Sequence, residues 1–318
     1  MTHPVIIAVG ELLVEFVSHH KGCELKALSE YSGPYPSGAP AICIDQAARL
    51  GAATALYGGV GADNFGAALI ERLNTNGVDT SGIEQLENKT TGVAFVSYFE
   101  DGSRTFIFHL NNTAADAIDQ SAVTLPQGPQ IMHISGSSLG NPLLRTAIES
   151  SAESVLKSGG QLSCDPNARP ELMKDAEVNS VLTGLIAKSS YLFPSDSDLE
   201  FLYPGCSQEQ AIEKLLDTGV ETIALTRGEQ GSTIYTADNS PLHLNGHAVV
   251  EVDPTGAGDC YCGTFLALTA RGESVETSGR YANAAGAIAV TRRGPMEGNS
   301  DLKTIEAFMK TNPAVAAA

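Results

Sequence analysis

The sequence predicts an α/β fold built on a mostly parallel sheet, with a small second sheet beside it. Two observations carry this prediction. Short apolar, β-branched runs alternate with helix-compatible segments along most of the 318 residues, and strands separated by helices pair in parallel. Two segments break this rhythm: residues 18–38 are polar and rich in Gly and Pro, and residues 90–110 hold two β-rich runs around Asp101-Gly102, which is a hairpin signal.

These breaks divide the chain into two parts. We expect residues 1–11, 39–89 and 113–318 to form the core, and residues 12–38 and 90–112 to form the small sheet. The apolar runs predict core strands at residues 4–9, 55–57, 130–135, 161–164, 191–193, 221–225, 232–235 and 248–252. The helix-compatible segments are residues 39–50, 67–74, 141–157, 170–187, 208–217, 258–270, 277–292 and 301–310. Polar residues follow several of these strands, and ligands bind at that edge of such a sheet.

Composition and charge narrow the classes of function. A hydrophobic fraction of 42% and a charged fraction of 18% are typical of a globular chain. The formal net charge of −18 argues against nucleic acid or an anionic membrane as a partner, because both attract basic surfaces. The first residues lack a basic segment followed by a long apolar one, and the six Cys are scattered. We therefore expect a cytoplasmic protein with reduced thiols and no membrane segment.

The strongest chemical signal lies in residues 253–259. Gly256 and Gly258 precede a helix-compatible segment, so the N–H groups at the start of that helix can face an anion, helped by the helix dipole. Asp259 adds a carboxylate at the same place. This combination suits a base that takes a proton from a hydroxyl while N–H groups hold a transferring phosphoryl group. The alternative is a plain turn in which Asp259 only favours the helix dipole.

Four motifs resemble those of the ribokinase-like (PfkB) carbohydrate kinases, in the same order and along nearly the whole chain. They are Gly59–Gly66, Asp165–Arg169, Thr226–Gly231 and Asp253–Asp259. The resemblance points to the branch of fructokinases, tagatose kinases and 2-keto-3-deoxygluconate kinases. It implies a Rossmann-like, mostly parallel central sheet flanked by helices, with a β-sheet lid through which a homodimer can form. It also implies ATP-dependent phosphoryl transfer to a sugar hydroxyl, with Mg²⁺ arriving with ATP and K⁺ or another monovalent cation beside the Gly turn.

The resemblance further implies roles for single residues. Asp259 is the base, and Gly256, Ala257 and Gly258 form the anion hole. Asp253 and Thr255 contribute oxygens to the monovalent cation, and Asp198 reaches Mg²⁺ through water. The positions that bind the sugar, together with Asp259, are Glu15, Gly38, Arg104, His109, Asn111 and Arg169. The positions that bind the nucleotide, together with Gly256 and Gly258, are Ser195, Thr226, Gly228 and Asn283.

Several of these assignments have alternatives. Asn283 matches a position that lines the adenine pocket, but the small residues around it are equally suited to close helix packing. Asp63 and Asn64 are also suited to capping the helix that follows them. Arg104 is either a surface charge on the hairpin or, as we expect from the position of the hairpin in the lid, a ligand for substrate.

The chain departs from the family pattern in its sugar-binding positions. A helix Asn that contacts sugar in relatives is Ile42 here. Glu15 stands where many relatives carry an Asp that binds sugar hydroxyls. Either Glu15 binds these hydroxyls in the same way, or Glu11 shares this role. Many fructokinase and 2-keto-3-deoxygluconate kinase relatives carry an aromatic residue followed by Arg in the lid strand, and the matching pair here is His109-Leu110. Because a substrate carboxylate needs a cation, this favours a neutral ketohexose such as fructose or tagatose, phosphorylated on a terminal hydroxyl. The alternatives are a 2-keto-3-deoxygluconate kinase, a nucleoside kinase and a non-catalytic sugar-binding relative.

Overall fold

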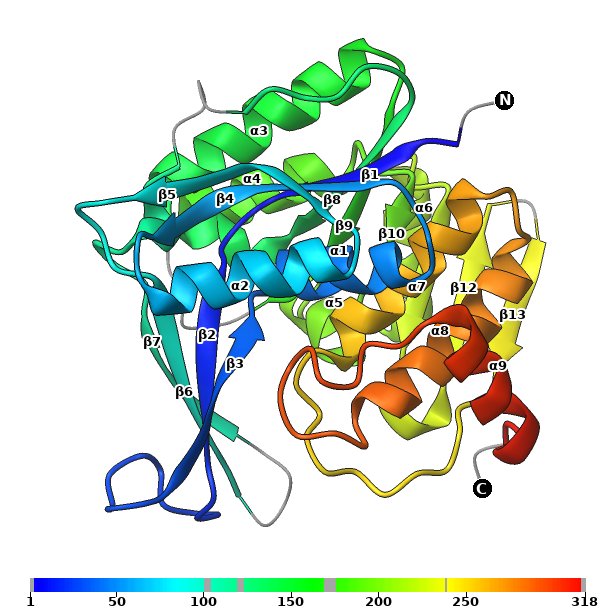
Figure 1. The fold of residues 1–318 in the computed structure, drawn as a ribbon. Helices are drawn as coiled ribbons and strands as arrows, with labels where there is room; N and C mark the ends of the chain where they lie inside the picture. Colours follow the sequence, from blue (N-terminus) through cyan, green and yellow to red (C-terminus); the bar gives the residue numbers. More distant parts are fainter. Residues whose placement is uncertain (1–2, 100–103, 119–122, 169–175, 238, 316–318) are drawn as a thin grey trace.

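Two β-sheets organise the molecule (Figure 1). The structure is a computed structural model that describes residues 3–99, 104–118, 123–168, 176–237 and 239–315. The larger sheet has nine strands in the order β13-β12-β11-β10-β9-β8-β1-β4-β5, and the smaller has four in the order β3-β2-β6-β7. The α/β class with a small second sheet, which the sequence predicts, is confirmed.

The large sheet is parallel apart from one edge. Its strands are β1 (Val5–Val9), β4 (Thr54–Gly61), β5 (Asp79–Leu86), β8 (Gln130–Ser135), β9 (Gln161–Asp165), β10 (Tyr191–Leu192), β11 (Thr222–Thr226), β12 (Ser232–Thr236) and β13 (Asn239–Leu244). The neighbours from β5 to β11 pair in parallel, whereas β12 and β13 are added antiparallel. The carboxyl ends of the parallel strands therefore meet at one edge, where ligands bind in such sheets.

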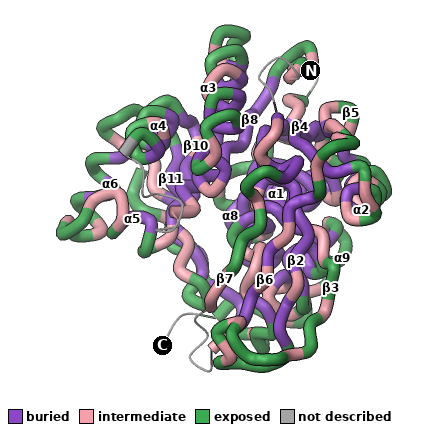
Figure 2. Tube along the Cα trace, turned by 90° about the vertical axis from the view of Figure 1, so that its left-hand side faces the viewer, coloured by how far each residue is buried: buried purple, intermediate pink, exposed green. Residues whose placement is uncertain are grey.

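Helices cover both faces of the large sheet (Figure 1). The helices packed in the first core are α1 (Ala39–Arg49), α2 (Asn64–Thr75), α7 (Ala257–Ala270), α8 (Val275–Ala289) and α9 (Leu302–Thr311). Those packed in the second core are α3 (Pro142–Lys157), α4 (Ala176–Ile186), α5 (Asp196–Leu202) and α6 (Gln208–Asp217). Strand β1 serves both cores, because Ile6 faces the first and Ile7 the second. Figure 2 shows this burial concentrated in the strands and in α1.

The small sheet stands off from the large one (Figure 1). It consists of β2 (Leu13–Ser18), β3 (Tyr31–Ser37), β6 (Gly92–Tyr98) and β7 (Arg104–His109). The central pair β2 and β6 is parallel, and β3 and β7 add antiparallel edges. The predicted pairing of β6 with β7 is thus confirmed, while the connecting turn at residues 100–103 lies outside the described residues.

One predicted strand is wrong, and two strands of the large sheet were not predicted. Residues 248–252 are not a strand: the chain runs from Leu244 to α7 without a helix or strand. Val250 is 82% exposed, so this β-branched run packs on no sheet face, and packing is what β-propensity mainly measures. Strands β5 and β13 were not predicted because their sequences, DTSGIEQL and NSPLHL, lack the short apolar run that marks the predicted strands. Among the described helices, none is long and apolar enough to cross a membrane.

Candidate active site

Two adjoining cavities lie where strand ends of the large sheet meet the start of α7. The first has a volume of about 220 Å³. Its polar lining includes Asp165, Asn167, Ser195, Asp198, Thr226 and Asp259, together with Arg104 from the small sheet. The second, of about 300 Å³, is lined by Gly228, Tyr261 and Asn283 among others. Thr226 and Gly258 line both cavities, so the two are adjacent halves of one candidate site.

The turn before α7 separates the two halves. Gly256 is the N-cap residue of α7 and has a φ of 82°, in the left-handed region that favours glycine. A Cβ on Gly256 would also clash with the carbonyl oxygen of Pro295. A Cβ on Gly258, in contrast, would meet no atom within 4 Å. Gly256 is therefore required by the backbone, whereas the missing side chain of Gly258 keeps space open between the two cavities.

Asp259 is the third residue of α7 and is 8% exposed. It lines the first cavity, and Ala257 lines the second. The first N–H groups of a helix have no acceptor within the helix, and that of Ala257 donates only a long hydrogen bond of 3.4 Å to the Pro254 carbonyl. The structure thus brings the predicted base and the predicted anion hole together at one point.

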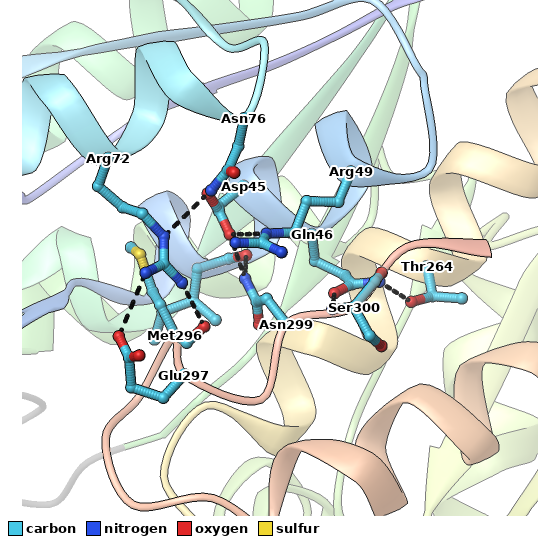
Figure 3. Close-up of polar contacts among 11 residues, drawn as sticks. Asp45, Gln46, Arg49, Arg72, Asn76, Thr264, Met296, Glu297, Asn299 and Ser300 are labelled. Carbon is cyan, nitrogen blue, oxygen red and sulfur yellow. Dashed lines mark hydrogen bonds and ion pairs between the residues drawn. The ribbon is translucent and has the colours of Figure 1, made fainter. Parts of the chain in front are cut away.

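A buried polar network anchors the loop behind this turn (Figure 3). Asp45 of α1 is fully buried. Its carboxylate accepts hydrogen bonds from Arg49 Nε at 3.1 Å, Asn76 Nδ2 at 2.5 Å and Asn299 Nδ2 at 2.8 Å. Three separate segments thus converge on one carboxylate. The sequence analysis missed this residue, and the spacing of Asp45 and Arg49 by one helical turn was its only local signal.

Neighbouring side chains extend the same network (Figure 3). Gln46 accepts from the Ser300 N–H at 2.8 Å and donates to the Ser300 carbonyl at 3.0 Å. Arg72 of α2 donates to the Met296 carbonyl at 2.8 Å. Residues 296–300 are thereby fixed to α1 and α2. Because Pro295 lies against Gly256, the network supports the turn from behind.

Asp253 and Thr255 contact the small sheet. The Tyr98 hydroxyl donates a short hydrogen bond to Asp253 Oδ1 and lies 2.6 Å from Thr255 Oγ1. The N–H of Gly294 donates to Asp253 Oδ2 at 2.9 Å. Burial, and then the charge of Asp253, raise the pKa of Tyr98 well above its usual range. The phenol therefore stays protonated and remains a donor. Nothing in the sequence near Tyr98 or Asp253 predicts this contact.

Asp198 is engaged in local structure. It forms a capping box with Ser195 at the start of α5. Its Oδ2 accepts from Ser195 N at 2.8 Å and from Ser195 Oγ at 2.5 Å, and its Oδ1 accepts from Ala168 N at 2.8 Å. This helix was missed because the sequence analysis assigned the same two residues to a ligand. The structure shows that they cap a helix and line the cavity at once.

The donor set fits a magnesium ion that arrives with a nucleotide. The carboxylates of Asp165, Asp198 and Asp259 line the first cavity, and Mg²⁺ prefers such oxygens. Within the described residues, no group of three His, Cys, Asp or Glu side chains is placed to hold a metal ion by itself. Mg²⁺ usually keeps several waters and binds through one or two carboxylates and substrate phosphates.

The predicted sugar-binding residues are not all brought together. Arg104 lines the first cavity and lies 5.3 Å from the centre of the Phe106 ring. The lining does not include Glu15, Gly38, His109 or Asn111, all of which are described residues. Arg169 lies outside the described residues.

The same four residues have distinct surroundings. Glu15 is buried in β2. Gly38 has a φ of 113°, and a Cβ there would clash with the carbonyl of Glu11, so close packing already requires glycine. His109 and Asn111 are exposed. Their predicted contacts with sugar therefore remain predictions.

Glu11 belongs to a hydrogen-bonded chain that reaches the cavity. Its carboxylate accepts from Ser137 Oγ at 3.1 Å and, by a shorter bond, from Ser138 Oγ. Ser137 Oγ lies 2.8 Å from Ser135 Oγ, which accepts from Asn167 Nδ2 at 3.2 Å. Because Asn167 lines the first cavity, this chain connects the end of β1 to the site.

Two residues with alternative interpretations have clear contacts. Asn283 lines the second cavity, and its amide donates to the carbonyls of Leu244 and Asn245 at 3.1 and 3.2 Å. It therefore fixes the wall of that cavity in addition to lining it. Asp63 caps α2 by accepting from the N–H of Gly66 at 2.9 Å, as the capping alternative predicts.

Comparisons with known proteins show which family the chain belongs to. Residues 5–302 match the model of the pfkB family of carbohydrate kinases. The chain is 31% identical over 306 residues to probable fructokinase-5 of Arabidopsis thaliana, covering 92% of this chain and 93% of the relative. It is 33% identical over 304 residues to probable fructokinase-3 of the same plant, covering 91% and 87%.

Solved structures with a similar fold include two sugar-kinase relatives. An E. coli protein provisionally named Ribokinase II, in complex with ATP and Mg²⁺, superposes with a TM-score of 0.91 at 39% identity, covering 97% of this chain and 99% of that one. A fructokinase from Vibrio cholerae O395 with fructose, ADP and calcium ion superposes with a TM-score of 0.86 at 24% identity, covering 96% and 99%, which supports the fold. The chain is a sugar kinase and belongs to the pfkB family of carbohydrate kinases.

Proposed function

We propose that the enzyme transfers the γ-phosphoryl group of ATP to a terminal hydroxyl of a neutral ketohexose of the fructose or tagatose type. The observation that carries the proposal is the position of Asp259. Its carboxylate lines one cavity at the first turn of a helix whose start also lines the other. A hydroxyl in the first cavity can lose its proton to Asp259 while a phosphate from the second is held at the helix start.

In this proposal the chain contributes position and charge. The N–H groups at Gly256, Ala257 and Gly258, with the α7 dipole, hold the transferring phosphoryl group. Asp259 takes the proton of the attacking hydroxyl. Mg²⁺, when bound with ATP beside Asp198, neutralises charge on the phosphate oxygens. Phosphoryl transfer needs little more than such positioning and charge stabilisation.

The small sheet acts as a lid in this proposal. It supplies Arg104 to the cavity lining, where a guanidinium can balance phosphate charge on a protein of net charge −18. The nucleotide base occupies the second cavity, next to Gly228 and Asn283. A homodimer formed through the lid remains a prediction.

The choice of sugar rests on two considerations. Curated relatives named as fructokinases align along more than nine-tenths of the chain. Leu110 stands where many fructokinase and 2-keto-3-deoxygluconate kinase relatives carry an Arg, and a substrate carboxylate would need such a cation. Arg104 in the cavity lining is the observation that favours a second candidate, a 2-keto-3-deoxygluconate kinase, because a substrate carboxylate could pair with it.

A coupled assay of ADP release over a panel of neutral and acidic sugars and nucleosides tests the proposal. We expect turnover of a neutral ketohexose. Strong turnover of 2-keto-3-deoxygluconate with none of fructose or tagatose would replace it with the second candidate. Binding of sugar and ATP without ADP release would indicate a non-catalytic relative.

The Asp259→Asn variant tests the base. It should lose about a hundredfold or more of kcat while still binding sugar, since general-base catalysis contributes about that much. Asp301→Asn is the matched control, because Asp301 also lies at a helix start but is an exposed cap of α9. Turnover of Asp259→Asn close to that of the control would remove Asp259 as the base.

A further inference from the structure

Tyr98 connects the lid to the phosphate-binding turn across 155 residues of sequence. It is the last residue of β6, and its hydroxyl contacts both Asp253 and Thr255. Arg104, its register partner on β7, places Nη1 3.4 Å from the same Thr255 hydroxyl. Two strands of the lid therefore reach the turn with side chains that donate hydrogen bonds.

These contacts involve side-chain oxygens of Asp253 and Thr255, the two residues that the family resemblance assigns to a monovalent cation. Asp253 is 1% exposed. Its Oδ1 accepts from Tyr98 and from the Thr255 N–H at 3.0 Å, and its Oδ2 accepts from the Gly294 N–H at 2.9 Å. The nearby Val290 carbonyl already accepts from the N–H groups of Val252 and Asp253, at 2.7 and 3.1 Å.

The positive charge of Arg104 also disfavours a monovalent cation at this position. The Arg104 guanidinium is permanently protonated, and it lies next to the Thr255 hydroxyl. A monovalent cation at that hydroxyl would sit beside a like charge, which is unfavourable at such short range. The described residues thus fit a protein-borne hydrogen-bond donor at Asp253 and Thr255 better than they fit K⁺.

We propose that Tyr98, assisted by Arg104, orders the turn at residues 253–256 in place of a monovalent cation. Tyr98 is a positioning residue, because it acts on the reacting groups through the turn. Assembly of the anion hole then depends on docking of the lid and is independent of K⁺. This inference rests on the proposed kinase function and adds a regulatory feature to the same site.

The Tyr98→Phe variant separates this role from simple packing. It keeps the ring and removes only the hydroxyl that contacts Asp253 and Thr255. If the hydroxyl orders the turn, kcat should fall about tenfold or more while KM for the sugar changes less than about twofold, because the lost hydrogen bond is made to the charged Asp253 of the turn. Tyr31→Phe is the matched control, because Tyr31 lies in the same sheet on the edge strand β3.

The experiment measures kcat, KM and Tm for wild type, Tyr98→Phe and Tyr31→Phe, with either K⁺ or tetramethylammonium as the only monovalent cation. We expect wild type and Tyr31→Phe to change by less than about twofold between the two cations, and Tyr98→Phe to lose kcat in both. A wild type activated about tenfold or more by K⁺ would overturn the proposal. So would a Tyr98→Phe variant that keeps the wild-type kcat.

The Tm readout separates failure of this inference from failure of the proposed function. If no sugar in the panel is phosphorylated, the proposed function fails, but the response of wild-type Tm to K⁺ still tests the cation site. A Tm that is equal in the two cations supports the proposal. A rise of several degrees in K⁺ overturns it, because it would show that K⁺ binds the folded chain.

Discussion

Gly256 and Gly258 lie two residues apart, and replacing each by Ala should have opposite consequences. At Gly256 the turn would hold the new Ala in the left-handed conformation, which costs about 1–2 kcal/mol. Its Cβ would also clash with the Pro295 carbonyl, which adds a similar amount. We therefore expect Gly256→Ala to destabilise the fold by about 3 kcal/mol. With about 2.1 cal/mol/K of unfolding entropy per residue, a chain of this length then loses about 4–5 °C in Tm.

Gly258→Ala should leave the fold intact and damage catalysis. Its Cβ meets no atom within 4 Å, and Ala is more favourable than Gly in a helix by roughly 0.5–1 kcal/mol. The Tm should stay constant or rise by about 1 °C. The added methyl group would occupy space between the two cavities, so kcat/KM should fall at least about tenfold, which corresponds to 1.4 kcal/mol of lost transition-state stabilisation.

The assay compares thermal melts with ADP release for both variants. Gly184→Ala is the matched control, since Gly184 lies within α4 and a Cβ there also meets no atom within 4 Å. It should gain the same small stability without losing activity. Wild-type kcat/KM in Gly258→Ala would refute the assignment of this space to the phosphate, and an unchanged Tm in Gly256→Ala would refute the strain argument.

Two further predictions concern buried polar groups. Asp45→Ala should lower stability by about 3–5 kcal/mol, because it leaves Arg49 without its buried acceptor; Glu153→Ala, which breaks an exposed ion pair, should cost less than about 1 kcal/mol, and equal melting losses would contradict the reasoning. Burial lowers the pKa of His133 to about 4. Between about pH 6.5 and pH 4 the unfolded chain therefore binds a proton at this residue that the folded chain does not bind. The free energy of unfolding consequently decreases as the pH is lowered through this window. Ser163 Oγ lies 3.0 Å from His133 Nδ1, so the control changes both residues, His133→Leu with Ser163→Ala. At pH 5 the loss of stability relative to pH 7 should be about 2 kcal/mol larger in wild type than in this double variant. Equal losses in denaturant unfolding would show that His133 is not the cause.

The sequence predicted the elements whose signals are local. The Gly turn, the helix that carries Asp259 and the pairing of β6 with β7 all follow from residues within about ten positions. The run at residues 248–252 shows the limit of this approach, because β-branched side chains form a strand only where a sheet face receives them. Here Val250 remains 82% exposed.

Contacts between distant segments could not be predicted in this way. Nothing near Tyr98 in the sequence indicates Asp253 as its partner, and nothing near Asp45 indicates Asn299. Ser195 and Asp198 show a different difficulty, since one pair of polar residues caps a helix and also lines a cavity. Residue type and spacing fit both roles, and only the structure shows that both are present.

The turn at residues 253–256 is held from two sides, and the two supports differ in kind. Behind it, the Asp45 network is buried and fixed to the core helices, so its loss should appear mainly as a loss of stability. In front, Tyr98 contributes a single hydroxyl from a separate sheet, and one such hydrogen bond is worth roughly 1.5–3 kcal/mol. In a chain of this length such a loss lowers Tm by only about 2–5 °C, but it equals about a tenfold or larger change in rate. A disturbance of the lid should therefore appear more clearly in kcat than in Tm, whereas a disturbance of the Asp45 network should appear mainly in Tm.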